Sequence, residues 1–191
     1  MKKIFENHIV IRLGGNVERF HTERMLFRQS VAQHSFNAAL LAYDIAQTLN
    51  DLVLDSDLFV SPKDVMLYML MHDISEQAVG DIPSFTKKRH PVLSQMTSEA
   101  EKEFYDSKFV DTNFDLLDIS GTEKLICKFC DVFECACTCI EEIAMGNSNF
   151  RAILSRCENS IDKLINDCSM KTLTNIFIEL KGNLYEKSSN L

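Results

Sequence analysis

Four side chains that can bind a metal ion occur in the order His, His-Asp, Asp along the chain. His34 comes first, His72 and Asp73 are adjacent in the stretch MLMHDISE, and Asp131 lies within LICKFCDVFECA. A buried carboxylate is costly unless it is paired or bound to a metal, and one divalent cation would neutralise it. Mixed nitrogen and oxygen ligands suit Mn, Fe, Co, Ni or Zn better than Ca or Mg. We therefore expect one divalent transition metal, with positions left for water or a phosphate oxygen.

Each of these residues also has an ordinary structural explanation. His34 could cap a helix or pack in the core, and the pair His72 and Asp73 could bond to a helix end. Asp131 could pair with Lys128, three residues earlier on a helix. A metal site is favoured because it accounts for all four residues at once.

The elements that must position these residues are predicted to be helices, because the chain has only three prolines and six glycines and few alternating runs. We expect an all-α fold, a single compact helical bundle over residues 1–191. The stretch SPKD at 61–64 is typical of a helix start. That helix should continue to Gly80 and place Glu76 on the face of His72 and Asp73. The predicted helices cover residues 31–49, 61–79, 91–107, 122–145, 149–168 and 170–182, with a loop at 13–21.

Composition excludes several classes of protein. With 20 basic and 28 acidic residues the net charge is −8, which argues against binding to a nucleic-acid polymer. No apolar run is long enough to span a membrane, and the N-terminus lacks the pattern of a secretory signal, so a cytoplasmic protein is expected. Seven cysteines, among them one C-x-x-C at Cys127 and Cys130, are interpreted mainly as small core thiols rather than as a zinc site.

The order H…HD…D resembles the HD superfamily of metal-dependent phosphohydrolases. The segments SVAQHS (30–35), HDISE (72–76), GDIPS (80–84) and AMGNSNF (144–150) resemble, more narrowly, the bacterial 5′-deoxynucleotidase branch and related phage dATP triphosphohydrolases. The similarity extends over about residues 19–150. It implies an enzyme that hydrolyses the 5′-phosphate ester of deoxynucleotides, needs one essential ion (Co, Mn, Zn or similar), and forms a homo-oligomer.

The resemblance also assigns roles to residues. The metal ligands are matched by His34, His72, Asp73 and Asp131. Glu76 matches the catalytic acidic residue that orients or activates water, and Asp73 is assigned to catalysis as well as to the metal. The residues that match substrate contacts are Arg19 at the phosphate, Phe20 in place of the usual Trp, Asp81 at the sugar, and Pro83 and Lys87 in a loop over the nucleotide. Gln33 replaces a Glu commonly found before the first His.

The identity of the leaving group stays open at this point. A nucleotidase releases orthophosphate from a deoxynucleoside monophosphate, whereas a triphosphohydrolase releases tripolyphosphate from a dNTP, and both break the same ester. The run Lys87, Lys88, Arg89 could hold the outer phosphates or could be a solvated charge run. Two other classes remain as alternatives, a non-catalytic nucleotide-binding regulator and a purely structural helical domain. Glu76 argues against the regulator, which needs no base beside a metal.

Overall fold

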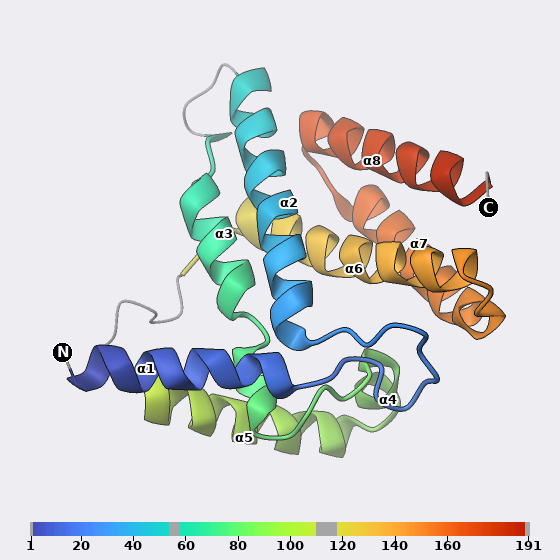
Figure 1. Ribbon diagram of the computed structural model, residues 1–191. Helices are drawn as coiled ribbons and strands as arrows, with labels where there is room; N and C mark the ends of the chain where they lie inside the picture. Colours follow the sequence, from blue (N-terminus) through green and yellow to red (C-terminus); the bar gives the residue numbers. More distant parts are fainter. Residues whose placement is uncertain (1, 54–57, 110–117, 190–191) are drawn as a thin grey trace. The chain divides into compact units, whose positions relative to one another are not determined.

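A computed structural model of the protein describes residues 2–53, 58–109 and 118–189. These residues form eight α-helices, three 3-10 segments and one isolated antiparallel bridge, with no strand among them (Figure 1). The prediction of an all-α fold is confirmed. The α-helices are α1 (Lys2–Leu13), α2 (Val31–Leu52), α3 (Pro62–Met71), α4 (Ser84–Arg89), α5 (Pro91–Phe109), α6 (Gly121–Ala144), α7 (Arg151–Asp167) and α8 (Lys171–Ser189). The 3-10 segments are η1 (Gly14–Asn16), η3 (Ile74–Gln77) and η4 (Ser148–Phe150).

The prediction that one helix runs from Ser61 to Gly80 is wrong in its second half. The start is as expected, since the Asp64 N–H donates to the Ser61 hydroxyl at 3.3 Å. However, α3 ends at Met71, a turn follows, and η3 covers Ile74–Gln77. Burial of η3 against α5 and η1 gives the physical reason, because tertiary packing overrides a local helical preference. Two helices that were not predicted are α1 and α4.

The chain divides into two units, of which the first comprises residues 1–35 and 70–117. In this unit α1, η3 and α4 pack on α5, and η1 packs on α1 and η3. The buried side chains include Tyr105 and Phe109 on α5, whose ring centroids are 5.1 Å apart. Gln77 ties η3 to α1 by donating to the carbonyl oxygen of Val10 at 3.0 Å. A Cβ atom at Gly14 would lie 3.1 Å from Cδ1 of Ile74, a tight contact, so glycine lets η1 lie close to η3 without displacing the Ile74 side chain.

The second unit comprises residues 36–69 and 118–191. Its centre is α6, which packs on α7 and α8 (Figure 1). A capping box starts α6, because the Ser120 hydroxyl accepts from the Glu123 N–H and the Glu123 carboxylate accepts from the Ser120 N–H. Phe129 of α6 and Phe177 of α8 are fully buried and stack with ring centroids 3.8 Å apart. Among the described residues, none of the helices has the length and apolar character that crossing a membrane requires.

Candidate metal centre

The segment before α2 is held by backbone pairing that fixes Arg19. Glu18 and Ser30 form the isolated bridge, and the Arg19 N–H donates to the Gln29 carbonyl oxygen at 2.9 Å. Ser30 then begins α2 by a reciprocal pair with Gln33. The Ser30 N–H donates to Oε1 of Gln33 at 2.8 Å, and the Gln33 N–H donates to the Ser30 hydroxyl at 3.2 Å. Gln33 therefore has a capping role here, which the S-x-x-Q spacing could have predicted.

The two histidines come from different elements of the first unit. His34 lies in the first turn of α2 and is fully buried, and His72 directly follows the last residue of α3. Their ring centroids are 5.4 Å apart, and one ligand atom of each ring lies within 4.8 Å of the other. The two imidazole rings therefore lie close together. His72 and Asp73 lie in a turn and not in the helix that was predicted for them.

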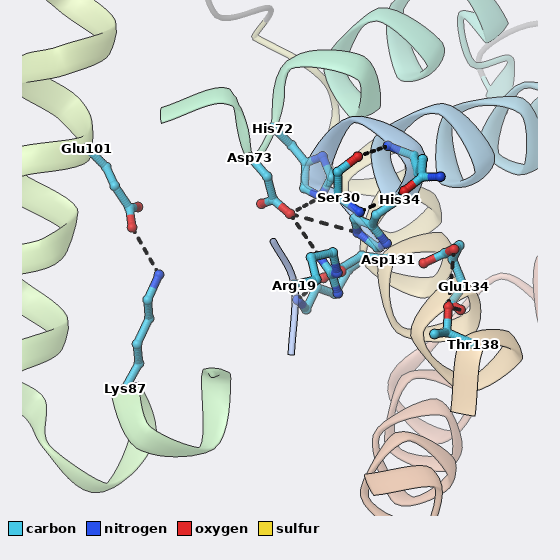
Figure 2. Close-up of polar contacts among 12 residues, drawn as sticks. Arg19, Ser30, His34, His72, Asp73, Lys87, Glu101, Asp131, Glu134 and Thr138 are labelled. Atoms are coloured by element: carbon cyan, nitrogen blue, oxygen red, sulfur yellow. Dashed lines mark hydrogen bonds and ion pairs between the residues drawn. The ribbon is translucent and has the colours of Figure 1, made fainter. Parts of the chain in front are cut away.

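Three side chains of the first unit, Arg19, His34 and His72, surround the Asp73 carboxylate (Figure 2). Its Oδ2 atom lies 3.1 Å from Nε2 of His72 and 3.8 Å from Nε2 of His34. The same oxygen accepts a hydrogen bond from Nη1 of Arg19 at 3.3 Å. Asp73 itself has φ −106° and ψ 8°, a sparsely populated conformation found at many active sites. Three potential metal-binding atoms thus lie around one point.

These donors fit a divalent transition metal. Bonds from such an ion to imidazole nitrogen and carboxylate oxygen are about 2.0–2.2 Å long, so adjacent ligand atoms are about 3 Å apart. The contacts of Asp73 with His72 and His34, at 3.1 and 3.8 Å, are close to that spacing. Two nitrogens with one carboxylate are also a donor set that suits first-row transition metals. The described residues therefore contain a His/Asp group that can hold a metal ion.

Glu76 is a buried carboxyl group beside this centre. It lies in η3 with 7% of its surface exposed, and its Oε2 atom has no hydrogen-bond partner among the described residues. Burial, together with the negative charges of Asp73 and Asp81, raises the pKa of Glu76 to about 9, although Arg19 and Lys87 act against this. Raised carboxyl pKa values of this kind are typical of functional sites, and a nearby cation would lower this one.

Asp81 interacts with the backbone of Phe20, the residue that follows Arg19. The Asp81 carboxylate interacts with the backbone N–H of Phe20, and burial raises the pKa of Asp81 in spite of this bond and of Arg19. Phe20 has φ 53°, which is costly for a bulky residue and persists only where the surroundings enforce it. The Arg19 guanidinium carbon lies 5.6 Å from the centre of the Phe20 ring. Asp81 thus helps to hold Arg19 and Phe20 in place.

The predicted substrate loop is partly helical, which corrects the sequence interpretation. Pro83 precedes the first residue of α4, and Lys87 lies within this helix. The Lys87 ammonium donates to the Glu101 carboxylate of α5 at 3.0 Å (Figure 2). Glu101 was not predicted from the sequence, because nothing in a spacing of fourteen residues indicates that α4 folds back on α5.

Asp131 is the one predicted ligand that belongs to the second unit. It lies in the middle of α6, and its Oδ2 atom pairs with the Lys128 ammonium at 2.6 Å. This is the i,i+3 ion pair considered from the sequence. All the other predicted site residues belong to the first unit, namely Arg19, Phe20, His34, His72, Asp73, Glu76, Asp81, Pro83 and Lys87.

Comparison with known proteins gives consistent results for sequence and fold. The family model "5′-deoxynucleotidase YfbR-like" matches residues 8–180. The 5′-deoxynucleotidase of Vibrio atlanticus (strain LGP32) is 26% identical over 158 residues, which are 77% of this chain and 79% of the relative. The 5′-deoxynucleotidase YfbR of Escherichia coli (strain K12 / DH10B) is 27% identical over 157 residues, 76% of this chain and 77% of the relative.

Two solved structures share the fold. The HD phosphohydrolase DatZ of cyanophage S-2L, bound to dA and one catalytic Zn²⁺ ion, has a TM-score of 0.67 and 13% identity over 96% of both chains. An HD-domain phosphohydrolase from Listeria innocua has a TM-score of 0.71 and 18% identity, covering 95% of this chain and 88% of that one. At these identities the likeness establishes the fold alone.

Proposed function

Because the chain belongs to the 5′-deoxynucleotidase YfbR-like family and is an HD-domain phosphohydrolase, we propose that it hydrolyses the 5′-phosphate ester of deoxynucleoside monophosphates. The products are the deoxynucleoside and orthophosphate. The observation that carries this proposal is the convergence of His34 and His72 on the Asp73 carboxylate.

His34, His72 and Asp73 would hold the ion, with Asp131 as a fourth ligand. Asp131 enters this set through the order H…HD…D, and its pairing with Lys128 would then be exchanged for the ion. When bound, a divalent cation stabilises negative charge on the phosphate and acidifies a coordinated water. Exchange of a surface ion pair costs little, because such pairs contribute about 0–1 kcal/mol.

Glu76 would accept the proton of the attacking water at its Oε2 atom. This atom is buried and has no hydrogen-bond partner in the described parts of the chain. A base must be ionised to act, and the presence of a cation beside Asp73 would favour the charged form of Glu76. Water oxygen then bonds to phosphorus, the bond from phosphorus to the 5′ oxygen breaks, and the 5′ oxygen would take the proton that Glu76 accepted from the water.

Arg19 would bind the phosphoryl oxygens of the substrate. Its side chain is only 10% exposed and already lies against Asp73, so it is ordered before substrate arrives. Asp81 would accept a hydrogen bond from the sugar, near the 3′ position. Phe20 would stack against the base, and Pro83 with Lys87 would border the nucleotide from the start and middle of α4.

A second candidate function is dNTP (dATP) triphosphohydrolysis at the same site. Its support is the basic last turn of α4, where Lys87, Lys88 and Arg89 follow one another. Cations of this kind bind the outer phosphates of a triphosphate. The same ester bond breaks in both reactions, so the leaving group distinguishes them.

A substrate panel with product identification tests the proposal. Purified protein is incubated with each dNMP, NMP and dNTP in the presence of Mn²⁺, Co²⁺ or Zn²⁺, and orthophosphate and tripolyphosphate are quantified. The proposal expects metal-dependent orthophosphate release from dNMPs, with NMPs poorer. Tripolyphosphate from dNTPs without turnover of dNMPs would favour the second function, and the absence of turnover with every metal would contradict both.

Association into a homo-oligomer is part of the same proposal. Four apolar side chains of α1, namely Ile4, Phe5, Ile9 and Leu13, are 73%, 65%, 42% and 47% exposed. An apolar surface of this kind is typical of a face that another protein covers. Light scattering of the purified protein tests this, and a monomer at all concentrations would contradict it.

A further inference from the structure

Three cysteine sulfurs of the second unit lie close together, apart from the residues assigned to catalysis. Cys135 and Cys139 are four residues apart on α6, and Cys157 lies on α7. All three sulfurs lie within 4.8 Å of one another, and those of Cys135 and Cys157 are 3.4 Å apart. A disulfide would need about 2.05 Å, so these groups are thiols.

Among the described cysteines, Cys135, Cys139 and Cys157 (the thiol cluster) are the three whose sulfurs lie close enough together to hold one ion. Residues four apart on a helix share a face, and α6 packs on α7. Cys139 is fully buried and Cys157 is 7% exposed, whereas Cys135 is half-buried. Hydrogen bonding within the cluster lowers the pKa of Cys157 and raises that of Cys139.

We propose that the thiol cluster of Cys135, Cys139 and Cys157 binds a soft, thiophilic metal ion of the Cu(I) or Zn(II) type. Bonds from such an ion to cysteine sulfur are about 2.3 Å long, so three sulfurs around it lie about 4 Å apart. The observed separations, 3.4 Å for one pair and below 4.8 Å for all, need adjustments within about 1 Å. Soft thiolate ligands select ions of this class over those preferred by imidazole and carboxylate.

The site has three protein ligands, which sets its coordination. The five histidines of the chain are at positions 8, 21, 34, 72 and 90, so the sequence from 118 to 191 has none. A three-coordinate sulfur site suits Cu(I), and Zn(II) would add a water on the Cys135 side. A bound ion joins α6 to α7, and Cys135 lies one turn after Asp131 on α6. The ion would therefore stabilise the helix pair from which Asp131 projects.

Sulfur-to-metal charge-transfer absorption tests the proposal without interference from the catalytic centre, which contains no sulfur. The full-length protein is titrated under reducing conditions with Cu(I) and, as a spectroscopic substitute for Zn(II), with Cd²⁺. We expect one sulfur-bound ion per chain, with the same three thiols becoming protected from alkylation. In Cys157→Ser and Cys139→Ser the metal affinity read from the band should fall about tenfold or more, since loss of even an outer-shell partner costs about 10–100-fold.

Matched controls are Cys137→Ser, on α6 between the cluster residues, and Cys168→Ser, both half-buried cysteines outside the thiol cluster. Both should keep the full band. If Cys157→Ser does not fold, as judged by circular dichroism, Cys135→Ser provides the same test, because a half-buried position tolerates serine better than a buried one. The proposal is overturned if the folded wild-type protein gives no band, if the cluster variants keep it, or if either control loses it equally.

Discussion

Two buried glutamates, one in each unit, show how differently the same side chain is used. Glu123 of the second unit is 9% exposed and Glu76 of the first unit is 7% exposed. Burial alone would raise both pKa values, but hydrogen bonds from the backbone N–H groups of Ser61 and Ser120 lower that of Glu123. Glu76 lacks such donors at Oε2, and its pKa rises to about 9.

Glu123 stabilises the fold, whereas Glu76 is available for proton transfer. Glu123 closes the capping box of α6 and also accepts from the Ser61 N–H at 2.7 Å, so both of its carboxylate oxygens accept backbone hydrogen bonds. Glu76 lies on a short 3-10 segment beside a group that can hold a cation. The second unit is built from long regular helices, whereas the first unit uses a turn and a strained Phe20 to bring charged groups together.

The largest expected effect is that of Asp73→Asn, which removes the carboxylate on which both histidines converge. We expect loss of bound metal and a fall in kcat of about 10³-fold or more, since metal and proton-transfer catalysis are lost together. Far-UV circular dichroism should stay close to wild type. The control is Asp106→Asn on α5, an exposed surface partner of Lys102. Unchanged metal content in Asp73→Asn would contradict the assignment.

Glu76→Gln should retain metal and substrate binding but lose turnover. Because the amide cannot accept the proton of water, kcat should fall by about 10²–10⁴-fold with little change in KM. Steady-state kinetics together with metal analysis measure this, and Glu103→Gln at an exposed position of α5 is the control. A wild-type kcat would remove Glu76 from the mechanism.

Glu123→Gln should show the opposite behaviour. The substitution replaces charge-assisted hydrogen bonds to Ser61 and Ser120, so the free energy of unfolding should fall by about 1–3 kcal/mol. The kcat of the folded enzyme should be unchanged. Urea unfolding and kinetics below the transition test both parts. If Glu123→Gln lowered kcat as strongly as Glu76→Gln, the contrast between the two glutamates would be lost.

The metal-free protein should become less stable as pH rises. Glu76 has a pKa of about 9 in the folded protein and about 4.5 in the unfolded chain, so the folded state binds more protons between these values. The free energy of unfolding should therefore fall by up to about 1.4 kcal/mol per pH unit in this range. Thermal unfolding of chelated protein measures this. The slope should flatten in Glu76→Gln, and equal slopes in the two proteins would contradict the assignment.

The smallest expected effect is that of Lys87→Ala and Arg89→Ala on substrates with outer phosphates. If the basic turn of α4 binds these phosphates, kcat/KM for dNTPs should fall by about tenfold more than for dNMPs, about 1.4 kcal/mol. Lys102→Ala, an exposed lysine on α5, is the control. Equal effects on both substrate classes would show that α4 does not distinguish them.

Much of the fold could be predicted because regular helices leave periodic patterns. The expected helices at 31–49 and 122–145 correspond to α2 (Val31–Leu52) and α6 (Gly121–Ala144). The two unpredicted helices, α1 and α4, are less regular in sequence: α1 has exposed apolar side chains, and α4 has only six residues. Their formation depends on packing with α5, which no local pattern reveals.

The structure brings the predicted residues His34, His72 and Asp73 close together, but on a backbone that differs from the predicted helix. The side chains around Asp73 could be named from the order H…HD…D, because one metal site accounts for these residues together although each has an ordinary explanation by itself. The end of α3 at Met71 could not be predicted, since the segment HDISEQA has no proline or glycine to mark a helix end. The break depends on η3 packing against Gly14 and on Gln77 reaching Val10.

Anomalous X-ray scattering from crystals grown with Mn²⁺ or Co²⁺ tests the central claim most directly. We predict one strong peak bonded to Nε2 of His34, Nε2 of His72 and a carboxylate oxygen of Asp73, with a position left for water. An ordered protein with no anomalous peak at these three atoms, in crystals saturated with either metal, would contradict the account.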